Sequence, residues 1–109
     1  MIEKLNITDL SKLKITTVKG WAVNFTYDNE QYFLHDDSDE DRCIGLYHKL
    51  NGRKSEWING QISLTRPIEY IRLNKGDKYK YSKNGKWNII YSHIDKEFFV
   101  KKLTYDGLI

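Results

Sequence analysis

A hairpin rich in lysine and aromatic residues, at 78–93, has the clearest potential for chemistry in this sequence. Asn84-Gly85 favours a two-residue type I′ turn, because both central residues of that turn need positive φ. Such a turn pairs Lys80 with Ile89 and brings lysines and rings to one face. The candidate binding residues are Lys78, Lys80, Lys86, Trp87 and Tyr91. Rings that stack on bases, beside lysines that neutralise phosphates, predict a surface for single-stranded nucleic acid.

The same hairpin has a simpler structural interpretation. Trp87, Ile89 and Tyr91 can be core residues of a sheet, with Lys78 and Lys80 extending their ammonium groups to solvent at its edge. Buried aromatic residues are common in sheets, whereas base-stacking surfaces are rare. The sequence therefore favours the core interpretation.

A second candidate site is a block of five carboxylates within six positions. Its members are Asp36, Asp37, Asp39, Glu40 and Asp41. Clustered carboxylates suit calcium or magnesium, but this block lacks the spaced ligands and the glycine of a calcium loop. At the start of a helix these side chains would interact favourably with the helix dipole. We therefore expect no metal here, and the block is an acidic patch that would speed encounter with a basic partner.

Residues suited to catalysis do not form a recognisable set. The histidines, at 35, 48 and 93, have no metal-ligand spacing and no cysteine pair. Cys43 is expected to face the core, and His48 lies five positions away, where a helix would point it elsewhere. The chain has no glycine-rich phosphate loop, no Gly-x-Ser-x-Gly motif and no His-Glu-x-x-His pair. We expect no catalytic residue, no metal and no cofactor.

The elements that would position these residues begin with a β-hairpin at 21–35. Large apolar side chains alternate with small or polar ones over residues 21–27, which predicts a half-buried strand. Asp28-Asn29 has the composition of a turn, and residues 31–35 return as the partner strand. Residues 11–18 are rich in β-branched side chains and add a third strand.

One amphipathic helix is predicted near 38–50. Its apolar residues recur at helical spacing and are Cys43, Leu46, Tyr47 and Leu50. The acidic block would occupy its first turn, and Asn51-Gly52 would end it. Gly45 within this range is unfavourable for a helix.

The second half of the chain predicts further strands. Residues 53–60 read as a loop, and 61–65 and 68–73 as short strands, the latter an exposed edge. The segment 95–103 fits a helix capped by Asp95 or a strand, and Phe98-Phe99-Val100 favours the strand. The predicted fold class is therefore α+β, an antiparallel sheet of about five to seven strands with one helix. Residues 1–109 are expected to form a single domain.

Composition excludes several classes of protein. The 109 residues are 39% hydrophobic and 14% aromatic, which is too much for a disordered chain. No apolar run approaches the 20 or so residues of a membrane span. A net charge of +3 is wrong for a DNA mimic, which is heavily acidic. The single cysteine and the absence of a secretory signal in residues 1–6 predict a cytoplasmic location.

Three functions follow from these observations. The first is a non-enzymatic protein-binding domain, a small inhibitor or regulator encoded by a phage or mobile element of a low-GC bacterium. Fourteen lysines and twelve isoleucines against one alanine indicate low-GC codons, and eight tyrosines and three tryptophans suit an interface. The alternative is single-stranded nucleic-acid binding by the hairpin at 78–93. The third is a small metal-dependent nuclease, which no named set of residues supports. The sequence leaves the oligomeric state open.

Overall fold

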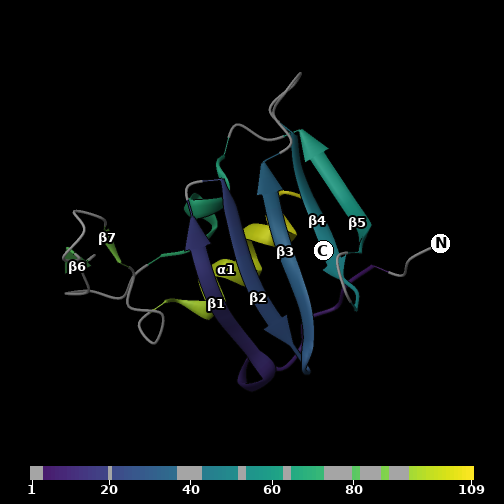
Figure 1. Ribbon diagram of the computed structural model, residues 1–109, viewed down its shortest axis with the longest axis horizontal. Helices are drawn as coiled ribbons and strands as arrows, with labels where there is room; N and C mark the ends of the chain where they lie inside the picture. The colour runs from purple at the N-terminus through teal and green to yellow at the C-terminus, as the bar shows by residue number, and fades with distance from the viewer. Residues whose placement is uncertain are drawn as a thin grey trace.

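The computed structural model describes residues 4–19, 21–36, 43–51, 54–62, 65–72, 80–81, 87–88 and 94–109. Five antiparallel strands form one sheet in sequence order, β1-β2-β3-β4-β5 (Figure 1). Their bounds are Leu13–Lys19, Ala22–Tyr27, Glu30–Asp36, Cys43–Lys49 and Ser55–Ile62. Short 3₁₀ helices, η1 (Leu10–Lys12) and η2 (Pro67–Tyr70), flank this sheet in the sequence. A two-stranded sheet, β6 (Lys80–Tyr81) with β7 (Trp87–Asn88), and the helix α1 (Lys96–Tyr105) follow.

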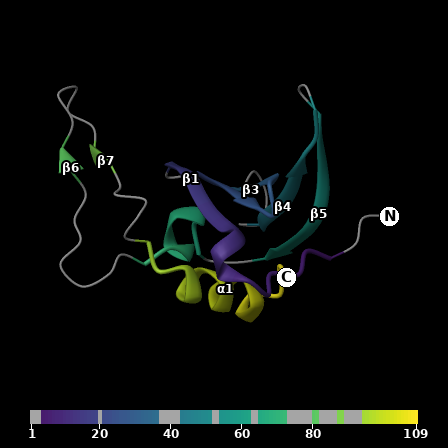
Figure 2. The same ribbon diagram turned by 90° about the horizontal axis from the view of Figure 1, so that it is seen from below.

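The core lies between the sheet and α1, and η2 contacts both (Figure 2). The sheet curves over the helix and contributes fully buried side chains from every strand up to β4. They include Leu13, Val23, Phe25, Leu34 and Leu46. From α1, Phe99 and Leu103 are also fully buried, and the Phe99 ring meets the Phe25 ring edge-on at 5.3 Å. The α+β class is thus confirmed, with five strands in the main sheet.

The predicted hairpin at 21–35 is confirmed as β2 and β3. Tyr27 pairs with Glu30, so Asp28 and Asn29 alone form the turn. Their φ angles are 50° and 68°, as a type I′ turn requires. β1 pairs antiparallel with β2 and completes the expected three-stranded meander.

The predicted helix near 38–50 is wrong, because residues 43–49 form strand β4. β4 pairs with β3 on one side and β5 on the other, so both edges of its backbone are hydrogen-bonded within the sheet. Ile44 and Leu46 alternate toward the core at a spacing of two. Cys43 is half-buried within this strand instead of lying in the core. Residues 38–42 lie outside the described residues.

The C-terminal segment is a helix, so the prediction of a strand there is also wrong. The Asp95 carboxylate accepts a hydrogen bond from the Phe98 N–H at 2.9 Å and caps the first turn of α1. At the other end Gly107 adopts a φ of 76°, and the Leu108 N–H donates to the Leu103 carbonyl at 2.9 Å. This is a Schellman termination, and Leu103 and Leu108 are both buried beside it.

Two further predictions between β4 and α1 are corrected. The predicted loop at 53–60 contains most of β5, which covers Ser55–Ile62. Within the predicted edge strand at 68–73, residues 68–70 belong instead to η2, which starts at Pro67 and buries Tyr70, and residue 73 lies outside the described residues. Proline at the first helical position fixes φ and lacks only an N–H that would have no helical partner. The edges of the main sheet are therefore β1 and β5.

Within the predicted hairpin at 78–93, β6 and β7 are antiparallel partners as expected. Their register differs, because Lys80 pairs with Asn88 and Tyr81 with Trp87. The prediction paired Lys80 with Ile89. The pairing on which the predicted lysine and aromatic face was built is thus shifted by one residue.

Candidate functional site

The face of the main sheet that points away from α1 is open among the described residues (Figures 1 and 2). Side chains of a strand alternate between its two faces, and cross-strand partners share a face. Because Leu13, Val23 and Leu34 are buried under α1, their sequence neighbours lie on the other side. We call this second side the open face.

A row of cross-strand partners crosses all five strands at the centre of the open face. In order from β1 to β5 the row is Thr17, Asn24, Phe33, Tyr47 and Trp57. The rings of Phe33 and Tyr47 stack with centroids 4.9 Å apart and planes 10° from parallel. Trp57 continues the row at the sheet edge, with 55% of its surface exposed. We call Phe33, Tyr47 and Trp57 the aromatic row.

Trp57 keeps its position because Gly60 leaves room for the indole. A Cβ at Gly60 would stand 3.1 Å from Nε1 of Trp57, closer than carbon normally approaches. A bulge between Leu46 and Tyr47 brings both Trp57 and Gly60 onto the open face. The ring therefore lies against the backbone of β5 and turns its outer side to solvent.

The rows beside the aromatic row are basic. One consists of Lys14, Thr26, Gln31, Lys49 and Ser55. The other consists of Lys19, Ala22, His35, Gly45 and Gly60. The three rows together hold three lysines and one histidine and not one carboxylate. The open face therefore favours an anionic ligand.

Trp21 adds a fourth ring at the β1–β2 end of this surface. It is 54% exposed and meets the His35 ring edge-on at 5.4 Å. The Lys19 ammonium lies 5.3 Å from the centre of the Trp21 ring, within the range of a cation–π contact. This end of the open face thus combines an exposed ring with a positive charge.

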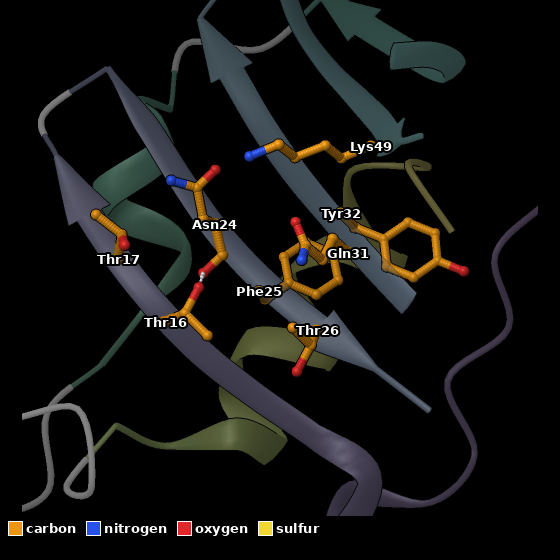
Figure 3. A pocket seen from close by; sticks show the side chains of 8 residues that line it. All are labelled: Thr16, Thr17, Asn24, Phe25, Thr26, Gln31, Tyr32 and Lys49. Atoms are coloured by element: carbon orange, nitrogen blue, oxygen red, sulfur yellow. Dashed lines mark hydrogen bonds between the residues drawn. The ribbon is translucent and has the colours of Figure 1, made fainter. Parts of the chain in front are cut away.

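A shallow polar hollow lies beside the aromatic row over β1, β2 and β3 (Figure 3). Its volume is about 270 Å³. Its lining residues are Thr16, Thr17, Asn24, Phe25, Thr26, Gln31, Tyr32 and Lys49. In Figure 3 the Lys49 side chain crosses β3 and points its ammonium group toward β2. We call this feature the polar hollow.

The opposite face of β3 and β4 carries a separate pair of ionisable residues. His48 Nε2 lies 3.0 Å from Oε2 of Glu30, and the His48 ring stacks on Tyr32 at 4.8 Å. Burial raises the pKa of the Tyr32 hydroxyl, and the Glu30 carboxylate adds to that rise. These contacts join neighbouring strands of the sheet.

Most of the residues predicted from sequence fall outside the described residues. Among the lysine and aromatic candidates, Lys78, Lys86 and Tyr91 do so, whereas Lys80 and Trp87 lie in β6 and β7. In the acidic block, Asp36 ends β3, and the other four, Asp37, Asp39, Glu40 and Asp41, are not described. Both sites therefore stay predictions.

Sequence reasoning missed the aromatic row for an identifiable reason. Local sequence patterns predict a helix at Tyr47 and a loop at Trp57, and neither element would align these rings with Phe33. The signal that was available is alternation within 43–49, where Tyr47 and Lys49 fall on the side opposite Leu46. Even so, alternation places residues on faces but not in register across strands.

Comparison of the chain with protein-family models, with curated proteins and with solved structures finds no match. Across the residues that the structure describes, no three side chains of His, Cys, Asp or Glu come together as a metal site. Within the same residues no helix has the length and apolarity needed to cross a membrane. The function must therefore be argued from the open face itself.

Proposed function

We propose that this protein is a non-enzymatic binding domain that holds single-stranded nucleic acid on its open face. The observation that carries the proposal is the aromatic row, Phe33, Tyr47 and Trp57, set between lysine-bearing rows that lack carboxylates. Every nucleobase has a ring face, so exposed rings bind successive bases with little dependence on sequence. Lysines on both sides of the row would neutralise the phosphates.

Trp57 is the strongest single stacking position. Its indole is held against Gly60 before any ligand arrives, and more than half of its surface is exposed. A ring that is already positioned loses little conformational entropy on binding. Phe33 and Tyr47 are half-buried and stack on each other, which continues the aromatic surface beyond Trp57. The row therefore provides space for more than one base.

The positive charge of the open face explains why single-stranded nucleic acid suits it better than a neutral ligand. Lys14, Lys49 and Lys19 lie on opposite sides of the aromatic row, on β1 and β4. Three phosphate contacts to a single strand give a slope of log affinity against log salt of about −2. Affinity should then fall roughly 20-fold between 50 and 200 mM salt.

The test is fluorescence anisotropy with labelled single-stranded oligonucleotides of DNA and RNA. We expect wild-type binding that weakens with salt, and a loss of about 5- to 150-fold for Trp57→Ala, which corresponds to ~1–3 kcal/mol for one stacked base. Tyr105→Ala is the matched control, because Tyr105 is 85% exposed on α1, away from the open face. Urea unfolding establishes that both variants are folded. Equal affinity of wild type and Trp57→Ala would overturn the proposal.

A second candidate function, binding to another protein, is favoured by the edge strand β5. Ile62 is 76% exposed and Trp57 55% exposed, both on this strand. β5 pairs only with β4 among the described residues, and an extended segment of a partner can add to such an edge. The inhibitor or regulator role expected from the sequence would take this form. Ile62→Asn should abolish capture of that partner after nuclease treatment and, because it adds no charge, leave oligonucleotide affinity unchanged.

A further inference from the structure

We infer that the polar hollow binds one nucleobase of the strand and selects adenine through the side-chain amides of Asn24 and Gln31. This inference rests on the proposed function and adds base preference to it. The hollow joins the aromatic row directly, because Asn24 is the cross-strand partner of Phe33. A base that leaves the stack at Phe33 would thus enter it.

The size of the polar hollow suits a single base. Its volume of about 270 Å³ lies just below the range of about 300–1,000 Å³ that holds drug-sized ligands. It lies at the surface of the sheet and is partly open among the described residues, so a base can enter from that side. A single base, with its sugar outside the hollow, fits this space better than a folded peptide or a larger cofactor.

Apart from Lys49, the lining of the polar hollow is uncharged and rich in hydrogen-bonding groups. Hydroxyls come from Thr16, Thr17 and Thr26, and the amides are those of Asn24 and Gln31. The Thr16 hydroxyl donates to the backbone carbonyl of Asn24 at 3.2 Å, which ties β1 to β2 at the side of the hollow. Neither amide side chain has a hydrogen-bond partner within the described part of the chain. Both amides are therefore available to a ligand.

An amide offers one acceptor and two donors, which is why it distinguishes bases. Asn and Gln side chains match the N6 donor and N7 acceptor of adenine with two hydrogen bonds. Asn24 and Gln31 are diagonal neighbours on adjacent strands, since Thr26 is the partner of Gln31. Diagonal neighbours lie about 7–8 Å apart, which allows a base edge between them.

Lys49 supplies a positive charge for the phosphate of the nucleotide whose base lies in the hollow. Its side chain lines the polar hollow and extends across β3 (Figure 3). In this position the ammonium group can neutralise the phosphate of the nucleotide whose base lies in the hollow. Lys49 also lines a second hollow with Asn29, Glu30, Gln31, Leu50 and Asn51.

The experiment compares labelled dT10 with the same strand carrying one central adenine, guanine or cytosine, and repeats it with RNA. The adenine strand should bind wild type at least about fivefold tighter than the other three, since a two-hydrogen-bond contact contributes ~1–3 kcal/mol. Asn24→Ala with Gln31→Ala should remove this preference, so that the double variant binds the adenine strand no more tightly than it binds dT10. Asn6→Ala, an exposed amide in the N-terminal segment, is the matched control and should keep the preference.

The possible results separate the two proposals. Equal affinity for all four strands would overturn the adenine preference while the proposed function stands. An adenine preference that survives in the double variant, with its fold verified by thermal melting, would overturn the assignment to the polar hollow. If free AMP displaces the oligonucleotide at the oligonucleotide's own concentration, the hollow binds a free nucleotide. That result would also overturn the proposal that the hollow selects a base within a nucleic-acid strand. Binding to none of the strands would overturn both proposals.

Discussion

The indole of Trp57 rests on the backbone at Gly60, where a Cβ would stand 3.1 Å from the indole Nε1. The same Cβ would also lie 3.4 Å from the carbonyl oxygen of Ile44, on the neighbouring strand. The backbone of Ile44 cannot give way without disturbing β4, so the indole is the part that must move. Gly60 therefore acts as a positioning residue for the most exposed ring of the aromatic row.

Gly60→Ala should weaken oligonucleotide binding although Trp57 is still present. The added methyl group displaces the indole, so we expect a loss of several-fold that does not exceed the loss for Trp57→Ala. Anisotropy titrations of both single variants and of the double variant measure this. If Gly60 acts through Trp57, adding Gly60→Ala to Trp57→Ala changes nothing further. Additive losses would mean that Gly60 acts independently.

Lys49→Gln should reduce the salt dependence of binding. Removing one phosphate contact to a single strand lowers the slope of log affinity against log salt by about 0.7. The measurement is a series of anisotropy titrations between 50 and 200 mM salt. Lys101→Gln removes an equal charge from the exposed side of α1 and serves as the control. Equal slopes for the two variants would count against a phosphate contact at Lys49.

Asp95→Ala should destabilise the fold by about 1 kcal/mol, the usual cost of losing a helix N-cap. The Phe98 N–H and the Arg72 guanidinium, 2.9 Å from the carboxylate, hold the pKa of Asp95 below its ordinary value of 3.8. Because the folded-state pKa is lowered, the stabilisation is present above pH 3.8 and is lost as the pH falls through the folded-state value. Urea unfolding of wild type and variant should therefore differ at pH 7 and converge at low pH.

A control for that series is Glu69→Ala, an exposed carboxylate of η2. Glu69→Ala removes an acidic side chain that, unlike Asp95, does not cap an α-helix. Its effect on the free energy of unfolding should be small at both pH values. The difference in the free energy of unfolding between wild type and Asp95→Ala should not stay constant from pH 7 to low pH. A constant difference would contradict the assignment of the lowered pKa to this cap.

Phe99→Ala should cost about 3–5 kcal/mol of stability, as expected for a large core side chain replaced by alanine. The ring is fully buried and meets Phe25 edge-on at 5.3 Å, so it attaches α1 to the middle of the sheet. Val100→Ala, at a half-buried position of the same helix, should cost less. Denaturant midpoints at constant m-value compare the two. Similar costs for both variants would show that α1 is not anchored mainly through Phe99.

Local signals in the sequence predicted some elements correctly. The β2–β3 hairpin follows from alternation on either side of Asp28-Asn29, whose residues tolerate positive φ. The Asp95 cap and the apolar pair Phe99 and Leu103 were also visible, yet they competed with β-propensity for the same segment. Packing against Phe25 and Tyr70 favours the helix there, and no local pattern reports such packing.

The candidate site depends even more on contacts between distant parts of the chain than the elements of the fold do. The residues of the aromatic row are separated by 14 positions between Phe33 and Tyr47 and by 10 between Tyr47 and Trp57. Only the register of three paired strands makes them neighbours. A one-residue slip would move each ring to the core side, so the open face depends on register as much as on composition.

By itself, then, the amino-acid sequence determined the α+β class, the β1–β2–β3 meander and its turn, because alternation and turn chemistry act between near neighbours. The tertiary structure alone decided that 43–49 is a strand and that 96–105 is a helix. It also decided that Phe33, Tyr47 and Trp57 align beside three lysines on the face of the sheet that points away from α1. Hydrogen bonding along two neighbouring strands and burial under α1 outweighed local preference at these positions, and both depend on contacts between distant parts of the chain.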